Sequence, residues 1–186
     1  MAPPKNIGPA DIEAAISRLA AAISARHGDT RRLLFLGIAN GGVELARRLA
    51  ARLGARPGTV DISFHRDDIG RQPIPKEFAP THIPADVHGE TVILADDVLF
   101  SGRTVKAALD ELFDHGRPAK VELAVLVDRG GRLMPVAADY TGLTLAPRPA
   151  EKVSVHLDEK NPARDSITVL RSAPPIRNPQ SAIHHS

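Results

Sequence analysis

The sequence predicts an α/β protein with a mostly parallel sheet, and two observations support this. Short apolar runs alternate with stretches whose apolar residues recur every three or four positions, as expected for strands alternating with amphipathic helices. Polar or glycine-containing segments follow these runs at 39–42, 66–70, 97–104 and 128–132. Because ligands bind beyond the carboxyl ends of the strands in such sheets, we expect these segments to form one site.

The length and composition indicate a single globular domain, expected over residues 1–173, with a polar tail at 174–186. Only 3% of residues are aromatic, so the core must consist mainly of Leu, Val, Ile and Ala. The absence of cysteine excludes disulfides, thiolate metal sites and thiol nucleophiles. No stretch approaches the ~20 apolar residues of a membrane span, so we expect a cytoplasmic location.

The first half of the chain is expected to contain a helix and then a βαβ unit. The helix lies between Pro9 and Gly28, where apolar residues recur at helical spacing. A buried strand at 32–38, a helix at 43–53 and a strand at 59–65 follow, and together they have the length of a βαβ unit.

Residues 66–87 interrupt this alternation. Three charged residues at 66–68 are followed by Gly70 and by four prolines, with little periodicity. Because both flanks are strongly patterned, we expect a mobile loop or β-arm over the site rather than a misassigned element. The alternation then resumes with a strand at 91–96, a helix at 104–115, a strand at 121–127 and two weaker strands. These last strands are expected near 152–157 and 166–170.

Asp96 and Asp97 come where the strand at 91–96 ends, and Ser101–Thr104 opens the next helix. Such a carboxylate pair can bind Mg²⁺, act as general acid and base, or hold two sugar hydroxyls. It can also simply cap a turn or pair with an arginine. The glycine turn and the helix N-terminus offer N–H groups and a positive dipole end to a phosphate. A site for a phosphorylated sugar is therefore our working hypothesis.

The run V-I-L-A-D-D-V-L-F-S-G-R-T at 92–104 resembles the phosphoribosyl-diphosphate signature of the type I phosphoribosyltransferases. The resemblance implies a mostly parallel twisted sheet flanked by helices, with a flexible loop over the active site. It implies that the two aspartates hold the ribose hydroxyls and that the loop after them holds the 5-phosphate. The phosphoribosyl diphosphate-binding residues implied in this way are Asp96, Asp97, Val98, Leu99, Phe100, Ser101, Gly102, Arg103 and Thr104.

Other segments are similar to the PyrR family, bacterial regulators of the pyrimidine operon that also have uracil phosphoribosyltransferase activity. Enzymes for hypoxanthine and guanine carry an acid where this chain has Phe100, which cannot hydrogen-bond a purine nitrogen. The similarity covers about residues 10–170. It includes H-R-D-D at 65–68, G-R-P at 116–118, L-A-V-L-V-D-R-G at 123–130, A-D-Y-T-G at 138–142 and E-K-V-S-V-H-L-D-E at 151–159.

This resemblance implies transfer of ribose 5-phosphate from phosphoribosyl diphosphate to N1 of uracil, giving UMP and diphosphate. Mg²⁺ is expected to bind through the diphosphate, without a metal site made of protein side chains. Arg66 would act with Asp96 and Asp97 in catalysis by reaching the diphosphate. Main-chain groups would read the edge of uracil, at Val127, Asp128, Arg129 and Gly130. The family also forms homodimers and higher assemblies.

Two positions depart from the family pattern. Well-studied members of the family have a motif that resembles K-T-R-G at the first loop. This loop is expected to bind the diphosphate. Here the loop is Ala39, Asn40, Gly41 and Gly42, which keeps a nest of backbone amides but lacks the cation. This change either weakens diphosphate binding or shifts that role to Arg66 and Arg103. In addition, Gly131 stands where the family often has histidine.

Two functional classes remain, an enzyme and an RNA-binding regulator that senses UMP or UTP and binds the pyrimidine operon leader mRNA. The family's basic face would fall on the helix at 43–53, with Arg47, Arg48 and Arg52 as the candidate contacts. A net charge of +2 does not by itself indicate nucleic-acid binding, and a solvated helix face explains these arginines equally well. A phosphoribosyltransferase for another base, such as orotate or adenine, is a third interpretation.

Overall fold

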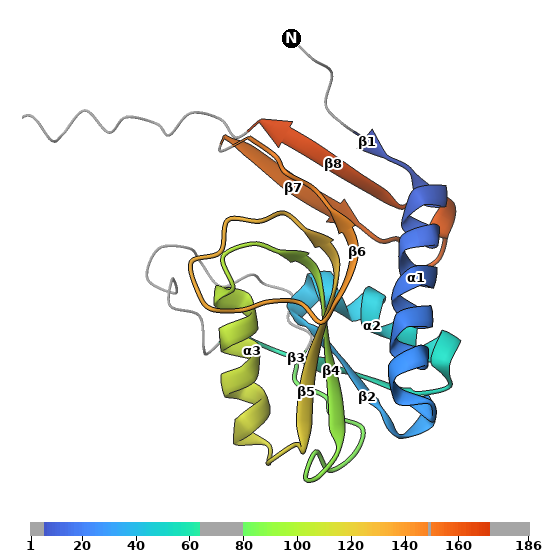
Figure 1. Ribbon diagram of the computed structural model, residues 1–186, viewed down its shortest axis with the longest axis vertical. Coiled ribbons are helices and arrows are strands. Elements are labelled where there is room, and N and C mark those ends of the chain that lie inside the picture. Colours follow the sequence, from blue (N-terminus) through green and yellow to red (C-terminus); the bar gives the residue numbers. More distant parts are fainter. Residues whose placement is uncertain (1–5, 64–79, 149, 172–186) are drawn as a thin grey trace, which may run out of the picture.

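The computed structural model describes residues 6–63, 80–148 and 150–171 of the chain. A five-stranded parallel sheet has helices on both of its faces, and a smaller antiparallel sheet lies beyond the carboxyl ends of its strands (Figure 1). The predicted α/β class is therefore confirmed. Among the described helices, none is long and apolar enough to cross a membrane.

The described helices are α1 (Pro9–His27), α2 (Ala39–Leu53) and α3 (Arg103–Asp114), with 3-10 turns at Thr30–Arg32 and Pro162–Arg164. The described strands are β1 (Asn6–Ile7), β2 (Leu34–Ile38), β3 (Arg56–Val60), β4 (Thr91–Leu99), β5 (Lys120–Asp128), β6 (Tyr140–Thr144), β7 (Glu151–His156) and β8 (Ser166–Arg171). The predictions for α1, α3, β2, β5, β7 and β8 agree with these bounds to within about two residues.

The parallel sheet has the strand order β3-β2-β4-β5-β6. Its central strands are almost continuously apolar because both faces are covered, and their side chains alternate between the two faces. Phe35 and Ile93 pack with α1 and α2, whereas Leu36 and Leu94 pack with α3 on the opposite face. Figure 1 shows these helices on the two sides of the sheet. The two apolar clusters bury the sheet and fix where its carboxyl edge lies.

The sequence did not predict strands β1 and β6, and it placed β3 too late in the chain. β1 is two residues long and β6 only five, so neither contains an apolar run that identifies it. β3 was placed too late because Pro57 and Gly58 are residues that usually argue against a strand. Proline is tolerated here because β3 is an edge strand of the parallel sheet. Whether these segments form strands therefore depends more on pairing with neighbouring strands than on their local sequence.

The segment expected as a mobile arm over 66–87 lies partly outside the described residues, which resume at 80. From there the chain packs against the sheet. Thr59 and His82 exchange two backbone hydrogen bonds of 2.9 Å, and Val87 is buried in the cluster under α3. Residues 80–87 of this segment are thus part of the packed structure and not of a mobile arm. The expected tail at 174–186 lies outside the described residues.

The small sheet, of order β1-β8-β7, is joined to α2 by a buried arginine. Arg48 is only 6% exposed, and its Nε donates to Glu44 Oε1 at 2.6 Å. Its other nitrogens donate to the two carboxylate oxygens of Asp165 at 2.5 and 3.1 Å and to the carbonyl of Asp158 at 2.8 Å. The expectation that Arg48 lies on a solvent-facing basic surface is therefore wrong, because its guanidinium orients the segment that leads into β8.

Replacing Arg48 with Met is expected to lower the free energy of unfolding by about 3–5 kcal/mol, because buried Asp165 and Glu44 lose their shared cation. Urea denaturation followed by circular dichroism measures this. Arg31→Met is the matched control, since Arg31 pairs with Asp29 at the surface, and we expect little change in the free energy of unfolding there. Equal losses in the two variants would contradict the account.

Candidate active site

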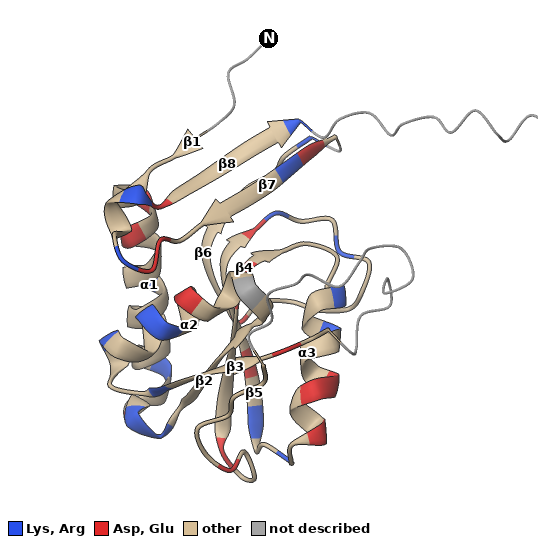
Figure 2. Ribbon diagram, turned by 180° about the vertical axis from the view of Figure 1, so that it is seen from behind, with Lys and Arg blue, Asp and Glu red and all other residues tan. Residues whose placement is uncertain are grey.

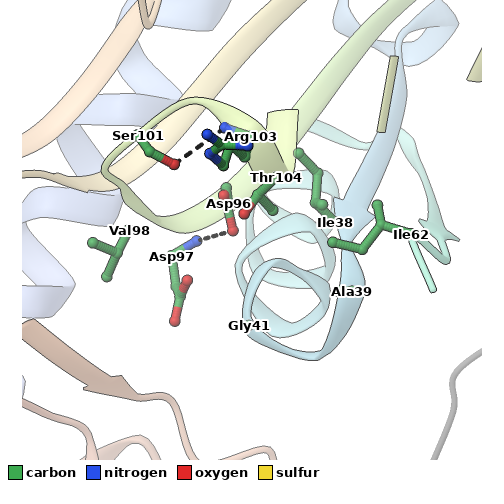
Figure 3. A pocket seen from close by; sticks show the side chains of 10 residues that line it. All are labelled: Ile38, Ala39, Gly41, Ile62, Asp96, Asp97, Val98, Ser101, Arg103 and Thr104. Carbon is green, nitrogen blue, oxygen red and sulfur yellow. Dashed lines mark hydrogen bonds between the residues drawn. The ribbon is translucent and has the colours of Figure 1, made fainter. Parts of the chain in front are cut away.

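The two aspartates of the predicted motif lie on the last part of β4. The strand runs on to Leu99, three residues beyond its predicted end. Asp96 is 4% exposed, and its Oδ1 accepts a hydrogen bond from the Asp97 N–H at 3.0 Å (Figure 3). Both residues nevertheless line the same cavity. The pair is therefore a buried feature of the strand end and not a pair of exposed turn residues.

This first cavity has a volume of about 420 Å³ and lies where β2, α2, β4 and α3 meet. Eight residues that the sequence predicted for the site line it, and Ile38 and Ile62 add apolar wall that the sequence did not indicate (Figure 3). The eight predicted residues are Ala39, Gly41, Asp96, Asp97, Val98, Ser101, Arg103 and Thr104. Leu99, which was also predicted, is instead buried in the core with 1% exposure.

The predicted diphosphate loop is the first turn of α2, and it packs directly against the end of β4. An added Cβ at Gly41 would lie 2.6 Å from Asp97 Cγ, and one at Gly42 would lie 2.0 Å from the carbonyl oxygen of Ala95. A side chain at Gly42 would meet the backbone of β4, so only glycine allows this approach. A side chain at Gly41 would require the carboxylate of Asp97 to move. The side chain of Asn40 lies outside the described part of the chain.

Burial sets the electrostatics of the aspartate pair. Loss of solvation raises the pKa of Asp96 well above its ordinary value, and the neighbouring charge of Asp97 raises it further. Burial also raises the pKa of Asp97, although the backbone N–H of Val98 acts in the opposite direction. Hydroxyl groups that donate to the carboxylates would stabilise their charged forms. The pair is therefore suited to a ligand that brings hydrogen-bond donors.

The loop between β4 and α3 has the geometry of an anion site. Gly102 has a φ of +90°, a conformation that favours glycine, and α3 begins immediately after it. Ser101 Oγ accepts a hydrogen bond from the N–H of Arg103 at 3.3 Å. The N–H groups of a first helical turn have no partners within the helix, so they are available to an anion.

A second cavity of about 320 Å³ shares Asp97 and Val98 with the first. Its walls are Phe100 and Arg129 on one side and residues 152–155 of β7 on the other. The sequence analysis missed Lys152 and Ser154. They lie in the E-K-V-S-V-H segment, which supported the family resemblance but received no role.

The four residues predicted to read uracil differ in their surroundings. Arg129 lines the second cavity, with its guanidinium 3.8 Å from the centroid of the Phe100 ring. The side chain of Val127 is buried in the core. The carboxylate of Asp128 accepts hydrogen bonds from Arg132 and from the N–H of Gly130, so it is already engaged. Of the other predicted residues, Arg66 lies outside the described residues.

Arg47 and Arg52 are on the outside of α2, but each is paired with a carboxylate. Arg47 donates twice to Glu44 at 2.7 Å, and Arg52 Nη2 lies 2.6 Å from both oxygens of Glu13. Figure 2 shows acidic and basic positions interspersed over this region of the helices. The exposed arginines of α2 are thus partly neutralised by their neighbours.

Comparison with known proteins is consistent with this geometry. The family model for the phosphoribosyl transferase domain matches residues 6–160. The bifunctional protein PyrR of Corynebacterium glutamicum is 46% identical over 172 residues, which cover 87% of this chain and 88% of its own length. This chain belongs to the PyrR family. Another family member, from Roseiflexus, is 42% identical over 87% of this chain and 92% of its own.

Solved structures with the same fold are more distant in sequence than these PyrR-family relatives. A hypoxanthine-guanine phosphoribosyltransferase from Bacillus anthracis is 17% identical with a TM-score of 0.62, over 92% of this chain and all of its own. The hypoxanthine phosphoribosyltransferase of Trypanosoma cruzi is 21% identical with a TM-score of 0.63, over 90% of this chain and 91% of its own. These likenesses confirm the predicted type I phosphoribosyltransferase fold.

The Asp96→Asn variant is expected to be more stable than the wild type at neutral pH. A folded-state pKa above the unfolded value means that stability falls as the pH rises from the unfolded pKa through the raised one. Asparagine removes this loss, while its side-chain oxygen can still accept from the N–H of Asp97. Thermal unfolding between pH 4 and pH 8 measures the effect. A wild-type protein as stable at pH 8 as at pH 4, or an Asn variant that is less stable, would contradict this.

Proposed function

We propose that this protein is a uracil phosphoribosyltransferase that forms UMP and diphosphate from uracil and phosphoribosyl diphosphate. One observation carries the proposal: in a PyrR-family chain, a cavity lined by buried Asp96 and half-buried Asp97 continues at Asp97 and Val98 into a second cavity. Two adjoining spaces that share one carboxylate suit a sugar phosphate and a base that must react with each other.

The first cavity suits the ribose phosphate. The carboxylates of Asp96 and Asp97 accept the two vicinal hydroxyls, and the turn at 101–104 with the N-terminus of α3 receives the 5-phosphate. The reacting carbon of the ribose then lies near Asp97, where the two cavities meet. Positive charge develops on the ribose as its bond to the diphosphate breaks. A fixed negative charge at this point favours that state, so the protein acts by positioning and electrostatics.

The second cavity suits a pyrimidine. The ammonium of Lys152 and the hydroxyl of Ser154 are donors for carbonyl oxygens of uracil, and Phe100 and Arg129 provide a flat wall. Phe100 offers no carboxylate to a purine. Two cations in this cavity would also suit a carboxylated pyrimidine such as orotate, so the assay below includes that base.

The diphosphate is expected at the N-terminal turn of α2, whose glycines bring backbone N–H groups beside Asp97. Arg103 lines this cavity and supplies positive charge. Mg²⁺ is expected to be carried by the diphosphate, with substrate oxygens and water as its main ligands. When bound, such an ion neutralises charge on the departing diphosphate.

Incubation with uracil, phosphoribosyl diphosphate and Mg²⁺ is expected to yield UMP, measured by chromatography. Asp97→Asn should lower kcat/KM by about 100-fold or more, as is typical for loss of one electrostatic contact in a site. Asp29→Asn, at the surface and outside both cavities, should leave it unchanged. Turnover of hypoxanthine or orotate without turnover of uracil would overturn the proposed substrate.

A second activity is proposed because the relatives named above are bifunctional proteins. The chain would bind the leader mRNA of a pyrimidine operon in a manner that depends on UMP or UTP. Of the three arginines first considered, Arg47 and Arg52 remain candidates, with side chains that are 54% and 31% exposed. Phosphate contacts would dominate, since the chain has few aromatic residues for base stacking.

A gel-shift titration with such a leader RNA tests this activity. UMP should tighten binding, and the affinity should fall with salt, as expected when phosphate contacts release counterions. The double variant Arg47→Ala with Arg52→Ala should weaken binding and reduce the slope of log affinity against log salt by about one per lost contact. Identical salt slopes for the wild type and this variant would exclude these arginines, and the absence of any UMP-dependent shift would exclude the regulatory role.

A further inference from the structure

The segment at 129–136, which links β5 to β6, lies against the loop that follows β4. Figure 1 shows the two loops together above the N-terminal end of α3. The backbone N–H of Arg129 donates to the carbonyl of Leu99 at 3.1 Å. Those of Leu133 and Met134 both donate to the carbonyl of Ser101, at 3.0 and 3.1 Å. The segment is therefore bonded to the loop and does not merely pass over it.

Arg132 lies at the centre of this contact. Its Nη1 donates to the carbonyls of Leu99 and Phe100 at 3.3 and 3.1 Å. Its Nε donates to the carbonyl of Val136 at 3.2 Å, and its Nη2 to Asp128 Oδ2 at 2.5 Å. One guanidinium thus joins the end of β5, the segment at 129–136 and the loop after β4.

These bonds determine which way the loop's amides point. In a planar trans peptide, the carbonyl of one residue and the N–H of the next point in opposite directions. The carbonyls of Leu99, Phe100 and Ser101 are turned toward the segment, so the N–H groups of residues 100–102 are turned away from it. Successive backbone N–H groups that are free of the segment can form a nest for an anion.

We propose that Arg132 is a positioning residue for phosphate binding, which holds the carbonyls after β4 so that the amides of the turn serve the ligand. It lines neither the first nor the second cavity, so it acts through the loop. This inference rests on the proposed use of that turn for the 5-phosphate, and it adds a residue that the signature at 92–104 does not contain.

Arginine is suited to this position because its planar fork carries five N–H donors and serves three carbonyls and a carboxylate at once. Asp128 fixes the guanidinium in place. Burial alone would raise the pKa of Asp128, but hydrogen bonds from Arg132 and from the N–H of Gly130 outweigh this and lower it. The segment also fits closely, since an added Cβ at Gly102 would lie 3.2 Å from Met134 Cβ. Lysine can replace the ion pair, but it cannot reproduce the fork.

Isothermal titration with ribose 5-phosphate tests the proposal without requiring turnover. Arg132→Met should weaken binding at least tenfold, Arg132→Lys should weaken it by a smaller factor, and Arg31→Met should bind like the wild type. In the steady state, Arg132→Met should raise the KM for phosphoribosyl diphosphate far more than the KM for uracil. A general loss of structure would raise both together, and thermal unfolding of each variant shows whether it is folded.

Wild-type affinity in a folded Arg132→Met protein would overturn the inference. If that variant does not fold, Arg132→Lys tests the inference instead. Wild-type affinity for ribose 5-phosphate in Arg132→Lys would contradict the need for the guanidinium fork. A wild-type protein that binds ribose 5-phosphate but makes no UMP would overturn the proposed activity and leave this inference standing on the binding data. A wild-type protein that does not bind ribose 5-phosphate would overturn both.

Discussion

Two adjacent carboxylates at the end of β4, one buried and one half-buried, constrain the rest of the site. Asp96 and Asp97 lie between the first turn of α2 and the N-terminus of α3, where burial raises the pKa of each. Gly42 is required because a side chain there would meet the backbone of β4, and Gly41 leaves space for the carboxylate of Asp97. Such a pair costs stability in the free protein, and a ligand with hydroxyl donors offsets that cost when it binds.

Two arginines hold the segments that surround this pair of aspartates. The loop after β4 continues the strand and is held by Arg132, while Arg48 holds the segment before β8 and thereby the small sheet that contains β7. β7 supplies Lys152 and Ser154 to the second cavity. Buried or half-buried arginines thus set the positions of two walls of the site without lining the first or the second cavity.

The sequence predicted the parts of the fold and site that depend on local pattern. The apolar runs at 91–96 and 121–127 identify strands buried on both faces, and the motif at 92–104 is continuous in the chain. Lys152 could not be assigned a role in this way, because it reaches the cavity only through the pairing of β7 with β8. Arg48 was misplaced because its position on an amphipathic helix does not show that Asp165 faces it from 117 residues away.

A crystal structure of the protein with UMP tests the central claim most directly, because it locates the sugar, the phosphate and the base together. The account predicts the ribose hydroxyls on Asp96 and Asp97, the phosphate at the turn of residues 101–104, and the uracil between Phe100 and β7. A nucleotide bound with its phosphate away from this turn, or with its base outside the second cavity, would contradict it.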